Sequence, residues 1–322
     1  MNKVLLRVED LHTFFFTRKG VVKAVDGVSF YVREGETFGL VGESACGKTV
    51  TALSIMRLLP EPAGQIVGGK IILDGTNLLE LHKNEMRKYR GKVISMILQD
   101  PMTSLNPVYT VGDQIAESVR LHQGLRDEKV EEEVISALRL LKIPSPEVIM
   151  RDYPFQLSGG MRQRAVGAIA MSCHPRLLIA DEPTTALDAT IQAQYIALFK
   201  DIQKKTNVAI MFITHDFGVV ANMCQRVGVM YAGKIIETAT TREIFKAPKH
   251  PYTSALMNSV PRLDQKGERL YSIKGQPPSL RDLPPGCRFF PRCLIAEDIC
   301  RQQEPPEVEI SQGHFVSCWR VK

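Results

Sequence analysis

The chain has 322 residues, a formal net charge of +6, and 44% hydrophobic and 24% charged residues. This is an ordinary globular composition with enough apolar material for a full core. Its apolar runs are shorter than the roughly 20 residues of a membrane-spanning helix, and the mild positive charge does not by itself indicate a nucleic-acid partner. The N-terminus lacks a convincing signal peptide, so we expect a cytosolic protein.

Residues 4–41 are predicted to form β-strands. The segment VLLRVEDLHTFFF has the apolar spacing of a strand, and short β-rich runs broken by glycines and charged turns follow it. We expect an antiparallel β patch that leads into a buried strand at TFGL. Three consecutive aromatic residues, Phe14, Phe15 and Phe16, end the first run.

The buried strand continues into a glycine-rich loop, VGESACGKTV. Its pattern is G-x-x-x-x-G-K-[ST], in which backbone N–H groups and a helix N-terminus bind polyphosphate. Lys48 would lie between the β- and γ-phosphates, and Thr49 would offer its hydroxyl to Mg²⁺. A turn with a chance lysine is disfavoured because a strand precedes the loop and a helix pattern follows it. The expected nucleotide-binding residues are Gly42, Glu43, Ser44, Ala45, Cys46, Gly47, Lys48, Thr49 and Val50.

Cys46 stands inside this loop, beside a helix N-terminus and Lys48. Such a setting favours a thiolate, so the residue could be a reactive handle that a bound nucleotide protects. The alternative is an inert small residue that fills the loop. Both interpretations stay open at this point.

The middle of the chain changes from strand patterns to helix patterns. VISMILQDP is predicted to be a buried strand that ends near Gln99 with a turn signal at Asp100 and Pro101. From about residue 111 to residue 150, apolar positions recur at spacings of three and four. We interpret about residues 100–165 as an inserted helical lobe.

Two further apolar runs, in RLLIADEPT and VAIMFITHD, are predicted to be buried strands with a helix between them, which indicates a parallel sheet. The first strand ends in Asp181 and Glu182. Two carboxylates at that position suit a Mg²⁺-dependent phosphoryl site, in which Asp181 belongs to the metal shell and Glu182 polarises the attacking water. The alternative, a structural pair of acids at a strand end, is common.

The heptapeptide LSGGMRQ at 157–163 resembles the signature sequence of ABC-type ATPases. Its serine and glycines would open a helix and form a second anion site there. A plain Ser-Gly helix cap would have the same geometry. In that family the signature closes over the γ-phosphate bound to the opposite subunit, so the resemblance implies a shared active site. The matching positions are Ser158, Gly159, Gly160 and Gln163.

The same resemblance assigns roles to other positions. Phe15 best matches the aromatic residue that stacks on adenine, with Phe14 and Phe16 as alternatives and core packing as another interpretation. Asp188 matches the D-loop, and Ala45 stands where relatives commonly have glycine. The implied catalytic residues are Glu182, His215 as the switch histidine, and Gln99 of the Q-loop. The implied magnesium ligands are Thr49, Gln99 and Asp181.

The fold that this resemblance implies is an α/β P-loop NTPase of the ABC type. It would contain a RecA-like parallel sheet core, an antiparallel β subdomain and the inserted helical subdomain. Residues 1–250 would form the ATPase domain, and residues 251–322 a family-specific, cysteine-rich C-terminal extension.

Four of the seven cysteines crowd the C-terminal region: Cys287, Cys293, Cys300 and Cys318. Four thiolates can hold zinc or an iron–sulfur cluster, and their spacers are wider than a zinc knuckle. Two disulfides are the alternative, which the cytosol disfavours. The segment PPGCRFFPRC around Cys287 and Cys293 resembles ATPase subunits of peptide importers, and this resemblance implies a [4Fe–4S] cluster in a structural role, with Zn²⁺ and a redox-sensing role as alternatives.

The flanking segments QDPMTSLNP, HPYTSALMNSVP and PPGCRFFPRC are similar to those of ATPase subunits of oligopeptide, dipeptide and nickel importers. This similarity implies a peripheral subunit on the cytoplasmic face of the cell membrane that uses ATP and Mg²⁺. Its partners would be two membrane permeases, a second ABC ATPase subunit and, indirectly, an extracytoplasmic substrate-binding protein, with no nucleic acid. Peptides are the expected cargo. The alternatives are nickel import, or a soluble ABC ATPase of DNA repair or translation.

Overall fold

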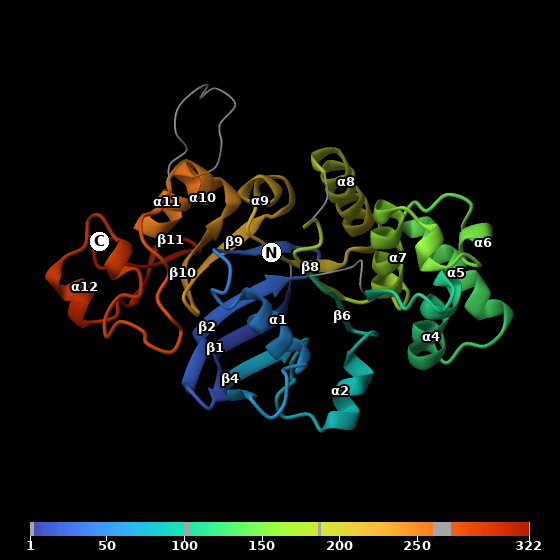
Figure 1. The fold of residues 1–322 in the computed structure, drawn as a ribbon, viewed down its shortest axis with the longest axis horizontal. Helices are drawn as coiled ribbons and strands as arrows, with labels where there is room; N and C mark the ends of the chain where they lie inside the picture. The colour runs from blue at the N-terminus through green and yellow to red at the C-terminus, as the bar shows by residue number, and fades with distance from the viewer. Residues whose placement is uncertain (1–2, 100–103, 186–187, 260–271, 322) are drawn as a thin grey trace. The chain divides into compact units, whose positions relative to one another are not determined.

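The computed structural model describes residues 3–99, 104–185, 188–259 and 272–321. Parts of the motifs QDPMTSLNP, TALD and HPYTSALMNSVP, including the predicted turn at Asp100 and Pro101, lie outside these residues. The chain forms two compact units (Figure 1). Unit 1 comprises Met1–Leu6, Val32–Thr37 and Leu73–Ile213, and unit 2 comprises Arg7–Tyr31, Phe38–Ile72 and Thr214–Lys322.

Most of the N-terminal β patch belongs to unit 2, where the strands follow the order β2-β1-β4. The strand predicted over VLLRVEDLHTFFF is confirmed as β1, whereas the short runs predicted after it were wrong, because β2 is one strand of 14 residues. Gly27 does not end β2, since its φ of 82° is accommodated inside the strand. The strands are β1 (Val4–Thr17), β2 (Gly20–Arg33) and β4 (Gly64–Leu73).

The second sheet of unit 2 has the order β11-β12-β10-β9-β3. β3 and β9 pair in parallel, and both are buried along their whole length, which explains their continuous apolar sequences. β10 pairs antiparallel with β9 and with β12, so the C-terminal strands extend this sheet. The strands are β3 (Thr37–Val41), β9 (Arg226–Tyr231), β10 (Lys234–Thr240), β11 (Glu307–Ser311) and β12 (His314–Ser317).

The helices of unit 2 are short. α1 starts directly after the phosphate loop, and it ends at Arg57, whose φ of 51° stops the helix. The helices are α1 (Lys48–Met56), α9 (Phe217–Met223), α10 (Thr241–Lys246), α11 (Pro251–Asn258), η2 (Phe290–Arg292) and α12 (Asp298–Gln302).

Unit 1 contains a parallel sheet in the order β8-β7-β6, which confirms the predicted strand, helix, strand arrangement. β7 is fully buried, and Asp181 at its end lies opposite Ile213 of β8. The elements of this part are β5 (Thr76–Asn77), α2 (Lys83–Tyr89), β6 (Ile94–Ile97), β7 (Leu177–Asp181), α8 (Ala189–Thr206) and β8 (Ala209–Thr214).

The predicted helical lobe is also part of unit 1, and its helices lie together in Figure 1. α4 buries Val111, Ile115 and Val119 along one stripe, and α4, α5 and α7 contact one another. The expected boundary at 250/251 stays a prediction. The lobe helices are α4 (Val111–Gln123), α5 (Glu128–Leu140), α6 (Pro146–Ile149), η1 (Pro154–Gln156) and α7 (Gly159–Met171).

In the parts of the chain that the structure describes, none of the helices combines the length and apolar character needed to cross a bilayer.

His250 precedes α11 and is only 1% exposed. Its Nδ1 accepts a hydrogen bond from the backbone N–H of Tyr252 at 3.0 Å, which caps the helix. Its own backbone N–H donates to the Glu237 carboxylate at 2.9 Å. Burial lowers the pKa of His250 to about 3, because the imidazolium form would lose its hydration.

We predict that His250 stays neutral from pH 8 down to pH 5. The reason is that its pKa is lowered, so protonation sets in only well below the ordinary histidine range. The measurement is an NMR titration of protein with labelled histidines. The signal of His250 is identified as the one that disappears in His250→Asn, a variant whose side-chain oxygen can still cap α11. A midpoint above pH 5.5 for that signal would contradict the burial argument.

Candidate functional site

The phosphate loop runs from the end of β3 to the start of α1 and passes very close to neighbouring backbone. A Cβ added to Gly42 would lie 2.1 Å from the carbonyl oxygen of Met230, and one added to Gly47 would lie 2.3 Å from that of Ala24. Gly47 also has a φ of 110°, which favours glycine. Both motif glycines are therefore required by the geometry of the loop.

The side chain of Lys48 binds the backbone of this loop. It is buried, and its Nζ donates hydrogen bonds to the carbonyl oxygens of Gly42 at 2.8 Å and Glu43 at 2.9 Å. These two bonds close the loop around the ammonium group. The contact of Lys48 with a phosphate stays a prediction.

Ala45 stands where the resemblance to ABC ATPases implies glycine. Its φ is 61°, in the left-handed region that costs a residue with a Cβ about 1–2 kcal/mol. The residue is exposed. A glycine at this position would avoid the strain of the left-handed backbone.

The structure decides between the two interpretations of Cys46. This residue is 5% exposed, and burial raises the pKa of its thiol despite the opposing effect of Lys48, whose Nζ lies 3.8 Å from the sulfur. The idea of a favoured thiolate was therefore wrong. Cys46 is a small buried residue that fills the loop, and its backbone carbonyl accepts a hydrogen bond from the N–H of Gly233 at 2.8 Å.

The three phenylalanines of β1 differ in exposure. Phe14 and Phe15 are partly buried, and Phe16 is 46% exposed. The ring of Phe14 lies 5.6 Å from the Nζ of Lys23, and a Cβ on Gly64 would touch the ring of Phe15. The assignment of the adenine-stacking ring among them stays a prediction.

The two carboxylates after β7 occupy different environments in unit 1. Asp181 is 1% exposed, and Glu182 is partly buried. Glu182 has a φ of 45°, its backbone N–H donates to Ile213 at 2.9 Å, and its carboxylate accepts from the Thr185 hydroxyl at 3.0 Å. A strained backbone at such a residue often accompanies function.

The signature segment opens α7 as predicted. The hydroxyl of Ser158 accepts a hydrogen bond from the N–H of Met161 at 3.3 Å and caps the helix. Gln163 is 2% exposed, and its Nε2 lies 3.5 Å from the carbonyl oxygen of Pro183, which follows Glu182. Gln163 thus connects the signature helix to the loop after β7. Sequence reasoning missed this contact because no local pattern indicates that a helix residue meets a loop 20 positions further along the chain.

The other expected site residues lie at element ends. Gln99 follows β6 and is exposed, and His215 follows β8 and is exposed. Asp188 caps α8, because its Oδ1 accepts from the N–H groups of Thr190 at 3.0 Å and Ile191 at 2.9 Å. The phosphate loop, the phenylalanines and His215 belong to unit 2, whereas Gln99, the signature, the two carboxylates and Asp188 belong to unit 1.

The four C-terminal cysteines line one cavity in unit 2. Burial raises the pKa of Cys287 to about 11 and also raises that of Cys293 and Cys318. Among the described residues, no three His, Cys, Asp or Glu side chains are close enough to hold one metal ion. The structure therefore gathers the four cysteines but does not bring them to the spacing of a mononuclear site.

One further contact to the phosphate loop comes from the motif HPYT. The hydroxyl of Tyr252 accepts a hydrogen bond from the backbone N–H of Glu43 at 3.0 Å. Tyr252 is fully buried, and its ring packs against Tyr231 with centroids 4.5 Å apart. A segment that sequence analysis noted only for its family resemblance thus supports the loop directly.

Comparison with known proteins identifies the family. Residues 25–185 match the profile described as ABC transporter, and residues 236–300 match Oligopeptide/dipeptide transporter, C-terminal region. The probable peptide ABC transporter ATP-binding protein y4tR of Sinorhizobium fredii is 53% identical, over 98% of this chain and 95% of that protein. The chain belongs to the ABC transporter family. It is accordingly an ABC-type ATPase.

Other relatives agree with this assignment. The dipeptide transport ATP-binding protein DppD of Bacillus subtilis is 51% identical, over 99% of this chain and 95% of that protein. Among solved structures, the dimeric post-hydrolysis state of the ATP-binding cassette MJ0796 bound to ADP and Pi has a TM-score of 0.66 at 22% identity, over 74% of this chain and 99% of that one. The structural match shows the ABC ATPase fold alone.

We predict that Asp188→Ala weakens the first turn of α8 by about 1 kcal/mol, because two helix N–H groups lose their acceptor. Asp188→Asn retains a capping oxygen and serves as the matched control. Hydrogen exchange at Thr190 and Ile191 should accelerate about fivefold in the alanine variant only. Equal protection in both variants would mean that the cap does not stabilise the helix.

Proposed function

We propose that this chain is the ATP-hydrolysing motor subunit of a membrane importer for peptides. The observation that supports this most directly is the near full-length similarity to ATP-binding proteins named for peptide and dipeptide transport. Residues 236–300 also match the C-terminal region of oligopeptide/dipeptide transporters, which separately supports a role in peptide transport. Nickel import and a soluble role in DNA repair or translation are not favoured by these relatives.

In this proposal the chain works on the cytoplasmic face of the membrane with two permeases and a second ABC ATPase subunit. An extracytoplasmic substrate-binding protein would deliver the peptide, so the cargo would not touch this chain. Mg-ATP would close the dimer by joining the phosphate loop of one subunit to the signature segment of the other. The first N–H groups of a helix have no acceptor within the helix, so the N-terminus of α7 at Ser158 suits such an anion contact.

Each site residue has a defined task in this proposal. Lys48 and the loop N–H groups would bind the β- and γ-phosphates, and Glu182 would accept a proton from the attacking water. Mg²⁺ would neutralise phosphate charge, with Thr49, Gln99 and Asp181 around it. His215 would contact the γ-phosphate, and one of the phenylalanines of β1 would stack on adenine.

We predict that Glu182→Gln retains Mg-ATP binding and lowers the turnover of the assembled transporter about 10²–10⁴-fold, because the amide cannot accept the proton from water. The matched control is Glu147→Gln, which removes an exposed carboxylate paired with Arg139. Phosphate release and ATP affinity are measured on the same preparations. Turnover of Glu182→Gln at the level of the control would remove Glu182 from this role.

We further propose that Cys287, Cys293, Cys300 and Cys318 hold a [4Fe–4S] cluster in a structural role. In a cubane cluster each thiolate binds a different iron, so the sulfurs stand farther apart than the about 3.8 Å of a tetrahedral zinc site. The observation that supports a shared metal centre is that all four cysteines line one cavity.

We predict that anaerobically purified protein is brown and contains about four irons per chain. Cys318→Ser should lose most of the iron, whereas Cys173→Ser, a buried cysteine of unit 1, should keep it. Iron content and visible absorbance are the measurements. One zinc, no iron and no visible absorbance would contradict the cluster.

A further inference from the structure

An ion pair between a buried arginine and a partly buried glutamate joins the C-terminal region to the phosphate loop within unit 2. The Arg292 side chain is 3% exposed, and its Nη1 and Nη2 donate to the two carboxylate oxygens of Glu43 at 2.6 Å and 3.0 Å. A guanidinium that binds a carboxylate with two parallel hydrogen bonds fixes both its charge and its orientation. Glu43 is the first residue after Gly42, and its carbonyl also accepts from Lys48.

The same guanidinium holds a second segment. Its Nε donates to the carbonyl oxygen of Lys274 at 3.3 Å. Shortly after Lys274, residues 276–280 line a cavity of about 650 Å³, which residues 43–46 of the phosphate loop also line. Arg292 therefore binds one residue that lines this cavity, Glu43, and the backbone two residues before another lining segment.

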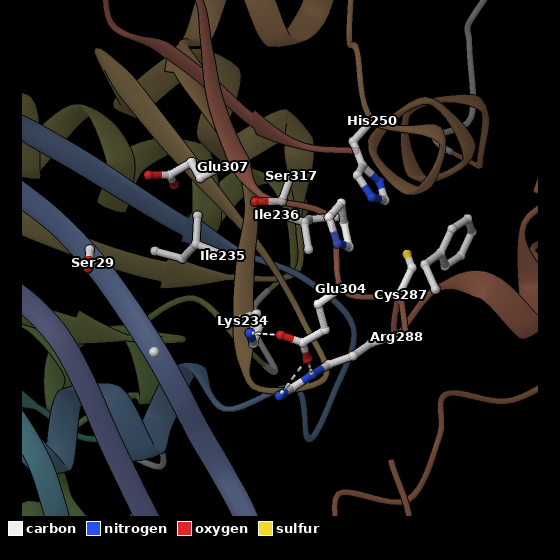
Figure 2. A pocket seen from close by; sticks show the side chains of 13 residues that line it. Ser29, Lys234, Ile235, Ile236, His250, Cys287, Arg288, Glu304, Glu307 and Ser317 are labelled. Atoms are coloured by element: carbon white, nitrogen blue, oxygen red, sulfur yellow. Dashed lines mark hydrogen bonds and ion pairs between the residues drawn. The ribbon is translucent and has the colours of Figure 1, made fainter. Parts of the chain in front are cut away.

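The segment that carries Arg292 is anchored at its other end as well. Arg288 is buried, pairs with Asp26 and donates to the carbonyl oxygen of Ala232 at 2.5 Å. Figure 2 shows Arg288 reaching toward Glu304, which also pairs with Lys234. With both arginines held, the position of residues 288–292 is fixed relative to the loop.

We propose that Arg292 is a positioning residue of the ATP site, which acts by neutralising Glu43 and by holding the backbone at Lys274, just before the cavity-lining residues 276–280. Without Arg292, the Glu43 carboxylate would stand uncompensated beside the polyphosphate and repel it. Removing one partner of a buried ion pair leaves an unbalanced charge, whereas removing both partners does not. The proposal therefore predicts that the effects of changing the two residues are not additive.

The test is the dissociation constant of Mg-ATP for the full chain, measured by calorimetry. Arg292→Gln should raise it about tenfold, which is about 1.4 kcal/mol. The double variant Arg292→Gln with Glu43→Gln should recover most of this loss, because the repelling carboxylate is gone. Arg320→Gln is the matched control, since Arg320 belongs to the same region but forms an exposed ion pair with Glu297.

A purely structural role would give a different pattern. It would lower the unfolding temperature of Arg292→Gln, the second substitution would restore that temperature, and the affinity of the folded protein for Mg-ATP would be the same in the single variant, the double variant and the unchanged chain. Arg292→Lys keeps the positive charge but cannot form the two parallel hydrogen bonds, so it should raise the dissociation constant of Mg-ATP about threefold. This variant provides the test if Arg292→Gln does not fold. An unchanged affinity in both Arg292 variants, or a double variant as weak as Arg292→Gln, would overturn the proposal.

Discussion

The phosphate loop is closed by one interaction, the hydrogen bonds from the Lys48 ammonium to the carbonyl oxygens of Gly42 and Glu43. This closure brings the loop so close to other backbone that glycine is required at positions 42 and 47. It also turns Glu43 toward the C-terminal region, where Tyr252 accepts its N–H and Arg292 binds its carboxylate. The site is therefore supported by residues more than 200 positions apart in the chain.

The sequence predicts those parts of the fold that depend on neighbouring residues. β3, β7 and β8 are continuous apolar runs, and they become strands that are buried throughout. The phosphate loop and the signature helix begin where their motifs place them, because glycine conformation and helix capping are local properties. For the same reason the positions of Asp181 and Glu182 at the end of β7 were predictable.

Other features depend on tertiary packing and left no local signal. The pKa of Cys46 could not be judged from its neighbours, because its burial outweighs the effect of Lys48. Gly27 interrupts the strand pattern in sequence but not β2 itself, since the surrounding β patch accommodates its backbone. The pairing of Arg292 with Glu43 joins two ordinary charged residues, and nothing in their spacing indicates a contact.

The central claim is that the loop from Gly42 to Thr49 binds ATP through Lys48. The most direct measurement is equilibrium binding of Mg-ATP to the Lys48→Ala variant, with Lys205→Ala at the exposed end of α8 as the matched control. Lys48→Ala should weaken binding at least about tenfold, because the loop loses the charge that faces the phosphates and the bonds that close it. Equal affinity in Lys48→Ala and Lys205→Ala would contradict the claim.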